Sequence, residues 1–176
     1  SDVCSSDLSR ENITFGGNAI NILGKEIKVG DKAPDFVAVN NDLSPFESKE
    51  LNGTVRIYSV VPSIDTGVCA IQTGNFNQMA TDLGDNVHVI TISNDLPFAQ
   101  ERFGAAEGID RAKLVSDYQI CDFGNKYGFL IEGLRLLTRG IVVVGEDDEV
   151  KYVEYVQEVT NHPDYDKALE AVKALI

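Results

Sequence analysis

The amino-acid sequence predicts an α/β fold with a mixed central sheet, flanking helices and an N-terminal β-hairpin. Three observations support this prediction. Segments rich in β-branched residues alternate with segments of helical period in the middle of the chain, turn sequences join pairs of apolar runs near both ends, and the chain closes on an amphipathic segment. Strands separated by helices pair in parallel, whereas strands joined by tight turns pair antiparallel.

The length and charge of the chain limit what it can be. Its 176 residues include 15 Lys and Arg and 28 Asp and Glu, which gives a net charge of −13. A chain of this length usually forms one domain with its own core. We expect that domain at residues 12–176, and we expect residues 1–11 to be a polar leader that is disordered or foreign to the natural chain.

The composition also excludes several classes of partner. Strong acidity argues against duplex nucleic acid and anionic membrane surfaces, which both select clustered Lys and Arg. No apolar run approaches the roughly 18 residues of a membrane-spanning helix. The three cysteines and two histidines are too few and too scattered for a disulfide scaffold or a structural zinc site. We therefore expect a cytoplasmic protein with no metal, cofactor, nucleic acid or membrane partner.

The first structured segment is predicted to be a hairpin. Two apolar runs, Ile13–Phe15 and Ala19–Val29, flank the Gly-Gly-Asn sequence at residues 16–18, whose glycines supply the positive φ that a tight turn requires. A short strand is predicted next at Phe36–Val39.

The rest of the chain alternates strands and helices. β-branched and aromatic residues predict a strand at Thr54–Val61, and helical periodicity predicts a helix at Gly67–Leu83. The apolar face predicted for this helix consists of Val68, Ile71, Phe76, Met79, Ala80 and Leu83. The later elements are predicted as a strand at Asn86–Ser93, a helix at Leu96–Ala106, a strand at Lys113–Val115, a short helix at Asp122–Tyr127, a strand pair at Arg139–Val144 and Val150–Val156, and a closing helix opened by Pro163.

This order of elements is the layout of a thioredoxin-like sheet, in which chemistry collects beyond the carboxyl ends of the parallel strands. Pro62 ends one such strand, Thr66 is a plausible N-cap, and Cys69 then falls in the first turn of a helix. Unpaired N–H groups and the helix dipole favour a thiolate there, which makes the sulfur nucleophilic. The alternative is a buried and inert cysteine.

The residues around Cys69 resemble those of a known family. The pattern Pro62-x-x-x-Thr66-x-x-Cys69 matches the P-x-x-x-[TS]-x-x-C signature of the peroxiredoxins, and the chain is similar to their bacterial thiol peroxidase branch over nearly its whole length. The further segments that carry this resemblance are residues 61–73, 94–103, 106–108 and 136–143.

The resemblance implies a reaction and roles for four residues. Cys69 is the peroxidatic cysteine, whose thiolate attacks a hydrogen peroxide or organic hydroperoxide and becomes a sulfenic acid. Thr66 and Arg139 orient the peroxide, and Pro62 shields the thiolate. Arginine suits this task because its forked donors stabilise charge that develops on the leaving oxygen. The resemblance also implies thioredoxin or another thiol as reductant, and a homodimer formed through the active-site edge.

One position departs from the family pattern. Members of this branch usually carry a resolving cysteine where this chain has Gly104. Three routes back to the thiol remain open: Cys121 could resolve the sulfenic acid after local unfolding, an external thiol could reduce it directly, or Cys4 could act from the leader. Two other functions also remain open. The protein could sense peroxide without efficient turnover, or it could be an interaction module with an inert cysteine.

Overall fold

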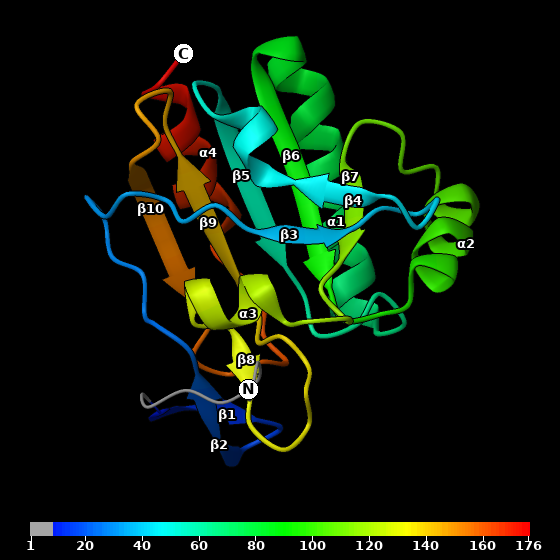
Figure 1. Ribbon diagram of the computed structural model, residues 1–176, viewed down its shortest axis with the longest axis vertical. Coiled ribbons are helices and arrows are strands. Elements are labelled where there is room, and N and C mark those ends of the chain that lie inside the picture. The colour runs from blue at the N-terminus through cyan, green and yellow to red at the C-terminus, as the bar shows by residue number, and fades with distance from the viewer. Residues whose placement is uncertain (1–8) are drawn as a thin grey trace.

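A computed structural model describes residues 9–176, which form a seven-stranded mixed sheet with strand order β10-β9-β5-β6-β7-β3-β4 and a three-stranded sheet with order β1-β2-β8. The small sheet lies beyond the end of the large sheet toward which β5 and β6 point (Figure 1). The strands are β1 (Ser9–Phe15), β2 (Asn18–Leu23), β3 (Val37–Val39), β4 (Pro45–Glu47), β5 (Val55–Val60), β6 (Val87–Ser93), β7 (Lys113–Ser116), β8 (Leu130–Ile131), β9 (Gly140–Val144) and β10 (Val150–Tyr155).

The helices are α1 (Gly67–Leu83), α2 (Pro97–Glu107), α3 (Asp122–Tyr127) and α4 (Tyr165–Lys173), with 3₁₀ turns at Ser48–Leu51 and Gly84–Asn86. β5 pairs in parallel with β6, and β6 with β7, while β9 and β10 continue the sheet antiparallel on the other side of β5. The predicted α/β order, mixed sheet and leading hairpin are therefore confirmed.

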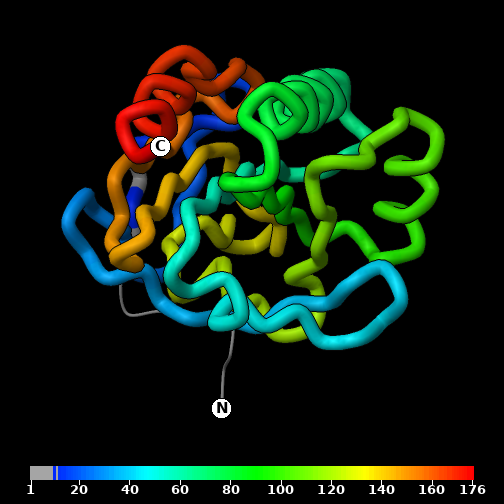
Figure 2. Tube along the Cα trace, turned by 90° about the horizontal axis from the view of Figure 1, so that it is seen from above, coloured from blue at the N-terminus to red at the C-terminus, as the bar shows by residue number. Residues whose placement is uncertain are grey.

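Two cores lie on opposite faces of the large sheet. α1 and α4 cover one face side by side (Figure 2), where Phe76 and Val172 pack against alternate residues of β5 and β9. The other face carries an aromatic cluster beneath α3, in which Phe36, Tyr58 and Phe123 meet edge to face. Successive strand residues point to opposite faces, so both sides of β5 are buried.

The N-terminal hairpin begins earlier and ends earlier than predicted. β1 starts at Ser9, so residues 9–11 belong to the hairpin and not to the leader, whereas residues 1–8, including Cys4, lie outside the described residues. β2 stops at Leu23 instead of Val29, because Gly24 takes a φ of +94° and an added Cβ there would lie 2.6 Å from the Asn125 carbonyl oxygen.

Other predicted boundaries also shift. The closing helix begins at Tyr165 and not at Pro163, because the Asp164 side chain caps it by accepting from the Lys167 N–H. The short strands β4 and β8 were not predicted. The apolar face predicted for α1 was wrong at Ile71, which is 52% exposed.

Among the described residues 9–176, every helix is too short or too polar to span a lipid bilayer.

Candidate active site

The candidate site sits where β5 passes into α1. β5 ends at Val60, Pro62 is buried in the connection, and Thr66 occupies the N-cap position with extended backbone. Cys69 is the third residue of α1, as predicted, so its sulfur lies beside the first turn of a 17-residue helix. Such a turn presents backbone N–H groups without helical partners and the positive end of the helix dipole.

Arg139 faces Cys69 across the site. Its Nη2 donates to the Cys69 Sγ at 3.2 Å, although 70 residues separate the two in the chain. Cys69 has 0% and Arg139 has 2% of its surface exposed, so the contact is shielded from water and from salt. A guanidinium at this distance stabilises a thiolate relative to a thiol.

Two further partners hold the Arg139 side chain. Nη1 donates to the Gln72 Oε1 at 2.9 Å, and Nε donates to the Val159 carbonyl at 2.7 Å. Gln72 is itself held, because its Nε2 donates to the Ser59 Oγ at 2.9 Å. The two guanidinium nitrogens that do not face the sulfur, Nε and Nη1, therefore each have their own acceptor. These two bonds fix the direction in which Nη2 points toward Cys69.

Gln72, Ser59 and Val159 are not among the site residues predicted from the sequence. A signal for Gln72 existed, since a residue three positions after Cys69 lies on the same helix face. The apolar face predicted for this helix instead includes Ile71, which is exposed, and omits Gln72 and Thr73, which are buried. Val159 contributes a backbone carbonyl, which leaves no mark on the sequence.

Gly140 allows Arg139 to reach this position. A Cβ at Gly140 would lie 2.1 Å from the Glu154 carbonyl oxygen and 2.6 Å from the Phe129 ring, so no larger residue fits where β9 begins. The Val156 N–H donates to the Arg139 carbonyl at 2.9 Å. The start of β9 therefore packs closely against the end of β10, and Arg139 is directed toward α1.

Thr66 and Pro62 are at the site, but Thr66 does not act as the predicted side-chain cap. Its hydroxyl donates to the Ser63 carbonyl at 3.1 Å, and no side-chain bond caps α1. Thr66 is exposed, whereas Pro62 is buried. Pro62 and Thr66 therefore lie in the connection that precedes α1, Cys69 lies in the first turn of α1, and Arg139 lies against the sulfur.

Asp95 ties the loop before α1 to the end of β6. Its carboxylate accepts from the Ser63 Oγ at 2.8 Å, from the Ile64 N–H at 2.9 Å and from the Ser93 Oγ at 2.6 Å. Ile64 is one of the apolar residues packed around Cys69. The carboxylate therefore holds the backbone of the loop that precedes Cys69.

Cys121 lies on the other side of the sheet. It is fully buried in the aromatic core under α3, whereas the turn of α1 that carries Cys69 packs against the face of Ser59. Its sulfur accepts from the Arg135 Nε at 3.2 Å. In this folded state the two sulfurs belong to different buried clusters.

Gly104 lies inside α2. A Cβ there would meet the Leu114 Cδ1 at 3.2 Å, a contact that a small shift of one side chain relieves. The structure thus shows no close backbone approach that demands glycine at this position. Nearby, Ala99 and Phe103 of the same helix pack against the apolar residues around Cys69.

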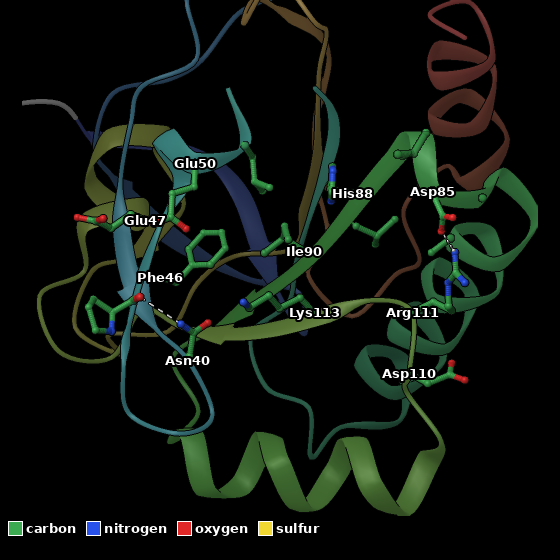
Figure 3. Close-up of a pocket in the computed structure, with 16 residues that line it drawn as sticks. Asn40, Phe46, Glu47, Glu50, Asp85, His88, Ile90, Asp110, Arg111 and Lys113 are labelled. Atoms are coloured by element: carbon green, nitrogen blue, oxygen red, sulfur yellow. Dashed lines mark hydrogen bonds and ion pairs between the residues drawn. The ribbon is translucent and has the colours of Figure 1, made fainter. Parts of the chain in front are cut away.

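An open cavity of about 540 Å³ lies away from this site, at the amino ends of β6 and β7 (Figure 3). Its lining mixes acidic residues with three basic ones, and its Asp85 and Arg111 point toward each other and form an ion pair. Its labelled residues in Figure 3 are Asn40, Phe46, Glu47, Glu50, Asp85, His88, Ile90, Asp110, Arg111 and Lys113. Within residues 9–176, no group of three or more His, Cys, Asp and Glu is arranged to hold a metal ion.

Comparison with known proteins places this geometry in a family. The redoxin family model matches residues 28–169. The chain belongs to the redoxin family, and within it to the thiol peroxidase branch of the peroxiredoxins. It is similar to the thiol peroxidase of Halalkalibacterium halodurans, with 56% identity over 93% of this chain and 98% of that protein. The thiol peroxidase of Bacillus subtilis is 51% identical over 93% of this chain and 98% of that protein.

Solved structures agree with the fold. A peroxiredoxin-like protein from Aquifex aeolicus superposes with a TM-score of 0.88 and 36% identity, covering 96% of this chain and 99% of that one. A thiol peroxidase from Chromobacterium violaceum shares the fold at a TM-score of 0.82 and 19% identity, covering 96% of this chain and 97% of that one.

Proposed function

We propose that this protein is a thiol-dependent peroxidase that reduces hydrogen peroxide and organic hydroperoxides, with Cys69 as the peroxidatic cysteine. The observation that carries the proposal is the contact between the Cys69 Sγ and the Arg139 guanidinium, which lie 3.2 Å apart and are both buried. Supporting it are the family membership and the relatives named thiol peroxidase.

The reaction begins with attack of the Cys69 thiolate on one peroxide oxygen. A sulfur–oxygen bond forms as the oxygen–oxygen bond breaks, and the departing oxygen leaves with the electron pair of that bond. Arg139 donates toward the charge that develops, and the departing oxygen takes up a proton to give water or an alcohol. Thr66 and Pro62 complete the pocket, with Pro62 as a shield and Thr66 as a second donor once its hydroxyl turns away from the Ser63 carbonyl.

Access to the sulfur requires a local movement. Cys69 has no exposed surface, and Val61, Ile64 and the side chains of Ala99 and Phe103 surround it. Ala99 and Phe103 come from α2, which is joined to β6 by a short loop. Peroxide therefore enters when α2 or the loop before α1 moves aside, and the small size of hydrogen peroxide keeps that movement small.

An external thiol completes the cycle. Gly104 has no sulfur, and Cys121 lies in the core on the opposite face of the sheet. The incoming thiol attacks the Cys69 sulfenic sulfur, releases water and forms a mixed disulfide. A second thiol then attacks that disulfide, which restores the Cys69 thiol and leaves the reductant oxidised. Thioredoxin, which carries two thiols, is the reductant we propose.

Peroxide consumption measured over many turnovers tests this function. Reduced protein is mixed with hydrogen peroxide, with either a thioredoxin system or dithiothreitol as reductant. We expect many equivalents of peroxide to be consumed, and none above background by Cys69→Ser. Consumption of one equivalent followed by arrest with both reductants would favour a peroxide sensor over an enzyme. A rate no faster than that of a free thiol would contradict both.

We further propose a homodimer that covers the edge of the site. Large apolar side chains are exposed on the loops and helix ends that border it, among them Leu96, Phe98 and Leu134. The Asn94 side chain bonds to the Arg135 carbonyl, which brings the loop of Leu134 next to the start of α2. Light scattering should give twice the mass of one chain for the wild type and the mass of one chain for Phe98→Glu combined with Leu134→Glu.

We place this activity in the cytoplasm. Both cysteines within residues 9–176 are free thiols, and the proposed cycle needs Cys69 to be returned to its reduced form. Reducing compartments maintain thiols in this state. Fractionation of source cells, with activity followed in each fraction, tests the placement.

A further inference from the structure

We propose that the N-terminal hairpin is a positioning element of the active site, which acts through Glu158 and the Val159 carbonyl to direct Arg139 toward Cys69. This inference rests on the proposed function, because it concerns how the peroxide-activating arginine is oriented. The hairpin contains no residue of the site, so its role would be exerted only through the segment that follows β10.

The hairpin holds that segment by its backbone. The Thr14 N–H donates to the Gln157 carbonyl at 2.8 Å, and the Val159 N–H donates to the Thr14 carbonyl at 2.8 Å. These two bonds extend the pairing of β1 beyond the small sheet. They clamp residues 157–159 along the strand edge of β1 near its turn.

Glu158 strengthens the clamp. Its carboxylate accepts from the Thr14 Oγ1 at 2.9 Å and from the turn N–H groups of Gly17 at 2.7 Å and Gly16 at 3.1 Å. Both glycines have positive φ, at +60° for Gly16 and +83° for Gly17, and the turn aims both N–H groups at one carboxylate. The Thr160 hydroxyl and N–H also donate to it, at 2.7 and 2.8 Å.

These donors act on the ionised form of Glu158. The Thr160 hydroxyl, the Thr160 N–H and the Gly17 N–H lower the pKa of Glu158 from 4.5 to about 2. The carboxylate is therefore charged at neutral pH, as its role of accepting all of these bonds requires.

Val159 connects the hairpin to the active site. Its side chain is 1% exposed and is buried with Ile13 and Ile22 of the hairpin and Ile131 of β8. Its carbonyl accepts from the Arg139 Nε at 2.7 Å. The residue is thus held by the hairpin at its N–H and its side chain, and it holds the arginine by its carbonyl.

We call the contacts that lead from the hairpin through Glu158 and Val159 to Arg139 the relay. The relay affects the reaction because only a few contacts set the direction of the guanidinium. Arg139 has Gln72 on one side, Val159 on another and the Cys69 sulfur on the third. If the Val159 carbonyl moves, the Arg139 guanidinium rotates. Its Nη2 donor then no longer points at the oxygen that reacts at Cys69. Misplacement of a donor by about 1 Å can slow a reaction on the order of a hundredfold, so a partial loss of order should slow it on the order of tenfold.

The test measures the single-turnover rate of reduced protein with hydrogen peroxide. Glu158→Ala should be slower than the wild type on the order of tenfold. Glu158→Gln keeps one acceptor oxygen for Thr14 and Gly17 and should recover part of the rate. Asp147→Asn, which removes an exposed carboxylate at the β9–β10 turn, is the matched control and should keep the wild-type rate. Circular dichroism and thermal unfolding identify any variant that fails to fold.

A double-variant cycle separates positioning from general destabilisation. If Glu158 acts through Arg139, then Glu158→Ala has no further effect in an Arg139→Ala background. An equal slowing in both backgrounds, or an unchanged rate for Glu158→Ala in the wild-type background, would overturn the relay while leaving the peroxidase function intact. Equal rates for Arg139→Ala and the wild type would overturn the role of Arg139, and the relay with it.

Thr14→Val tests the part played by the Thr14 hydroxyl. It removes only the hydroxyl donor to Glu158 and keeps the shape of the side chain, so we expect a smaller loss of rate in the same direction. A slowed Glu158→Ala together with an unchanged Thr14→Val would show that the Thr14 hydroxyl has no part in the effect, which would then depend on the N–H groups of Gly16 and Gly17 and on Thr160.

Discussion

The Arg139 Nη2 lies 3.2 Å from the Cys69 Sγ in a site where neither residue has more than 2% of its surface exposed. Burying a guanidinium is unfavourable unless its donors are paired. Here the sulfur, the Gln72 amide oxygen and the Val159 carbonyl provide that pairing. The site is therefore stable with the arginine already directed at the sulfur, before any peroxide arrives.

Gln72 should prove to be a positioning residue. Gln72→Leu removes the acceptor of Arg139 Nη1 and the donor to Ser59, and it leaves both partners buried. We expect a free energy of unfolding lower by about 1–3 kcal/mol, together with a slower single-turnover reaction with peroxide. Ser59→Ala is the matched control, since it removes only the far end of this network and should leave most of the rate. A fast Gln72→Leu variant would show that Arg139 needs no support from α1.

Cys121 should have no part in turnover. Cys121→Ser should match the wild type in steady-state peroxide consumption with either reductant, because its sulfur lies in the core on the other face of the sheet. Mass spectrometry of the peroxide-treated wild type should show oxidised Cys69 and no peptide linked to Cys121. A Cys69–Cys121 crosslink at the rate of turnover would instead establish Cys121 as the resolving cysteine.

The free energy of unfolding should depend on pH through the titration of Asp117. Burial raises the pKa of this carboxyl from 3.8 to about 7, against the opposing effect of the N–H groups of Gly124 and Phe123. The folded state then holds the proton more tightly than the unfolded state. The stabilisation is complete below the unfolded pKa and is lost as pH rises through about 7.

Urea unfolding of the wild type and Asp117→Asn at about pH 5.5 and 8.5 measures this effect. Because the unfolded carboxyl is ionised throughout this range, the wild type should lose about 2 kcal/mol relative to the variant as pH rises. A difference between the two proteins that stays constant with pH would show that Asp117 is ionised in the folded state across the range.

An ion pair at the far end of β5 should contribute to stability without affecting chemistry. The Arg56 Nη1 donates to the Asp148 Oδ1 at 2.8 Å, and Arg56 is 2% exposed. Asp148→Asn should lower the free energy of unfolding by about 1–3 kcal/mol, because it leaves a buried guanidinium without its counter-charge. The exposed pair of Lys151 with Asp147 is the comparison, and its loss should cost under about 1 kcal/mol. The peroxide reaction should be unchanged in both variants.

The elements could be predicted from the sequence because their signals are local. The alternation of β5, α1, β6, α2 and β7 follows from periodicity, and the position of Cys69 in the first turn of α1 follows from the residues just before it. The strand β4 opens on Pro45, which has no N–H for the strand ladder and is more typical of a turn, and β8 has only two residues, too few for any period to show. The prediction for Ile71 is wrong because the buried face of a helix is predicted from the spacing of its apolar residues. Here the buried face also carries the polar residues Gln72 and Thr73, which that spacing does not detect.

The site was predictable only in part. Local order indicates that Cys69 is reactive, but the pairing with Arg139 was implied by family resemblance, since no spacing rule joins residues 70 positions apart. Gln72 could have been found from its place on the helix face of Cys69. The Val159 carbonyl and the hairpin contacts to Glu158 arise from long-range folding alone, and a backbone acceptor has no sequence signal.

The pairing of Cys69 with Arg139 is tested most directly by the single-turnover rate of reduced protein with hydrogen peroxide, compared between the wild type and Arg139→Ala. If Arg139 supplies the donor for the breaking oxygen–oxygen bond, Arg139→Ala should be slower on the order of a hundredfold or more. Trapping should place the sulfenic acid on Cys69 in both proteins. Equal rates in the two proteins, or oxidation at another residue, would contradict the assignment of Cys69 and Arg139 as the reacting pair.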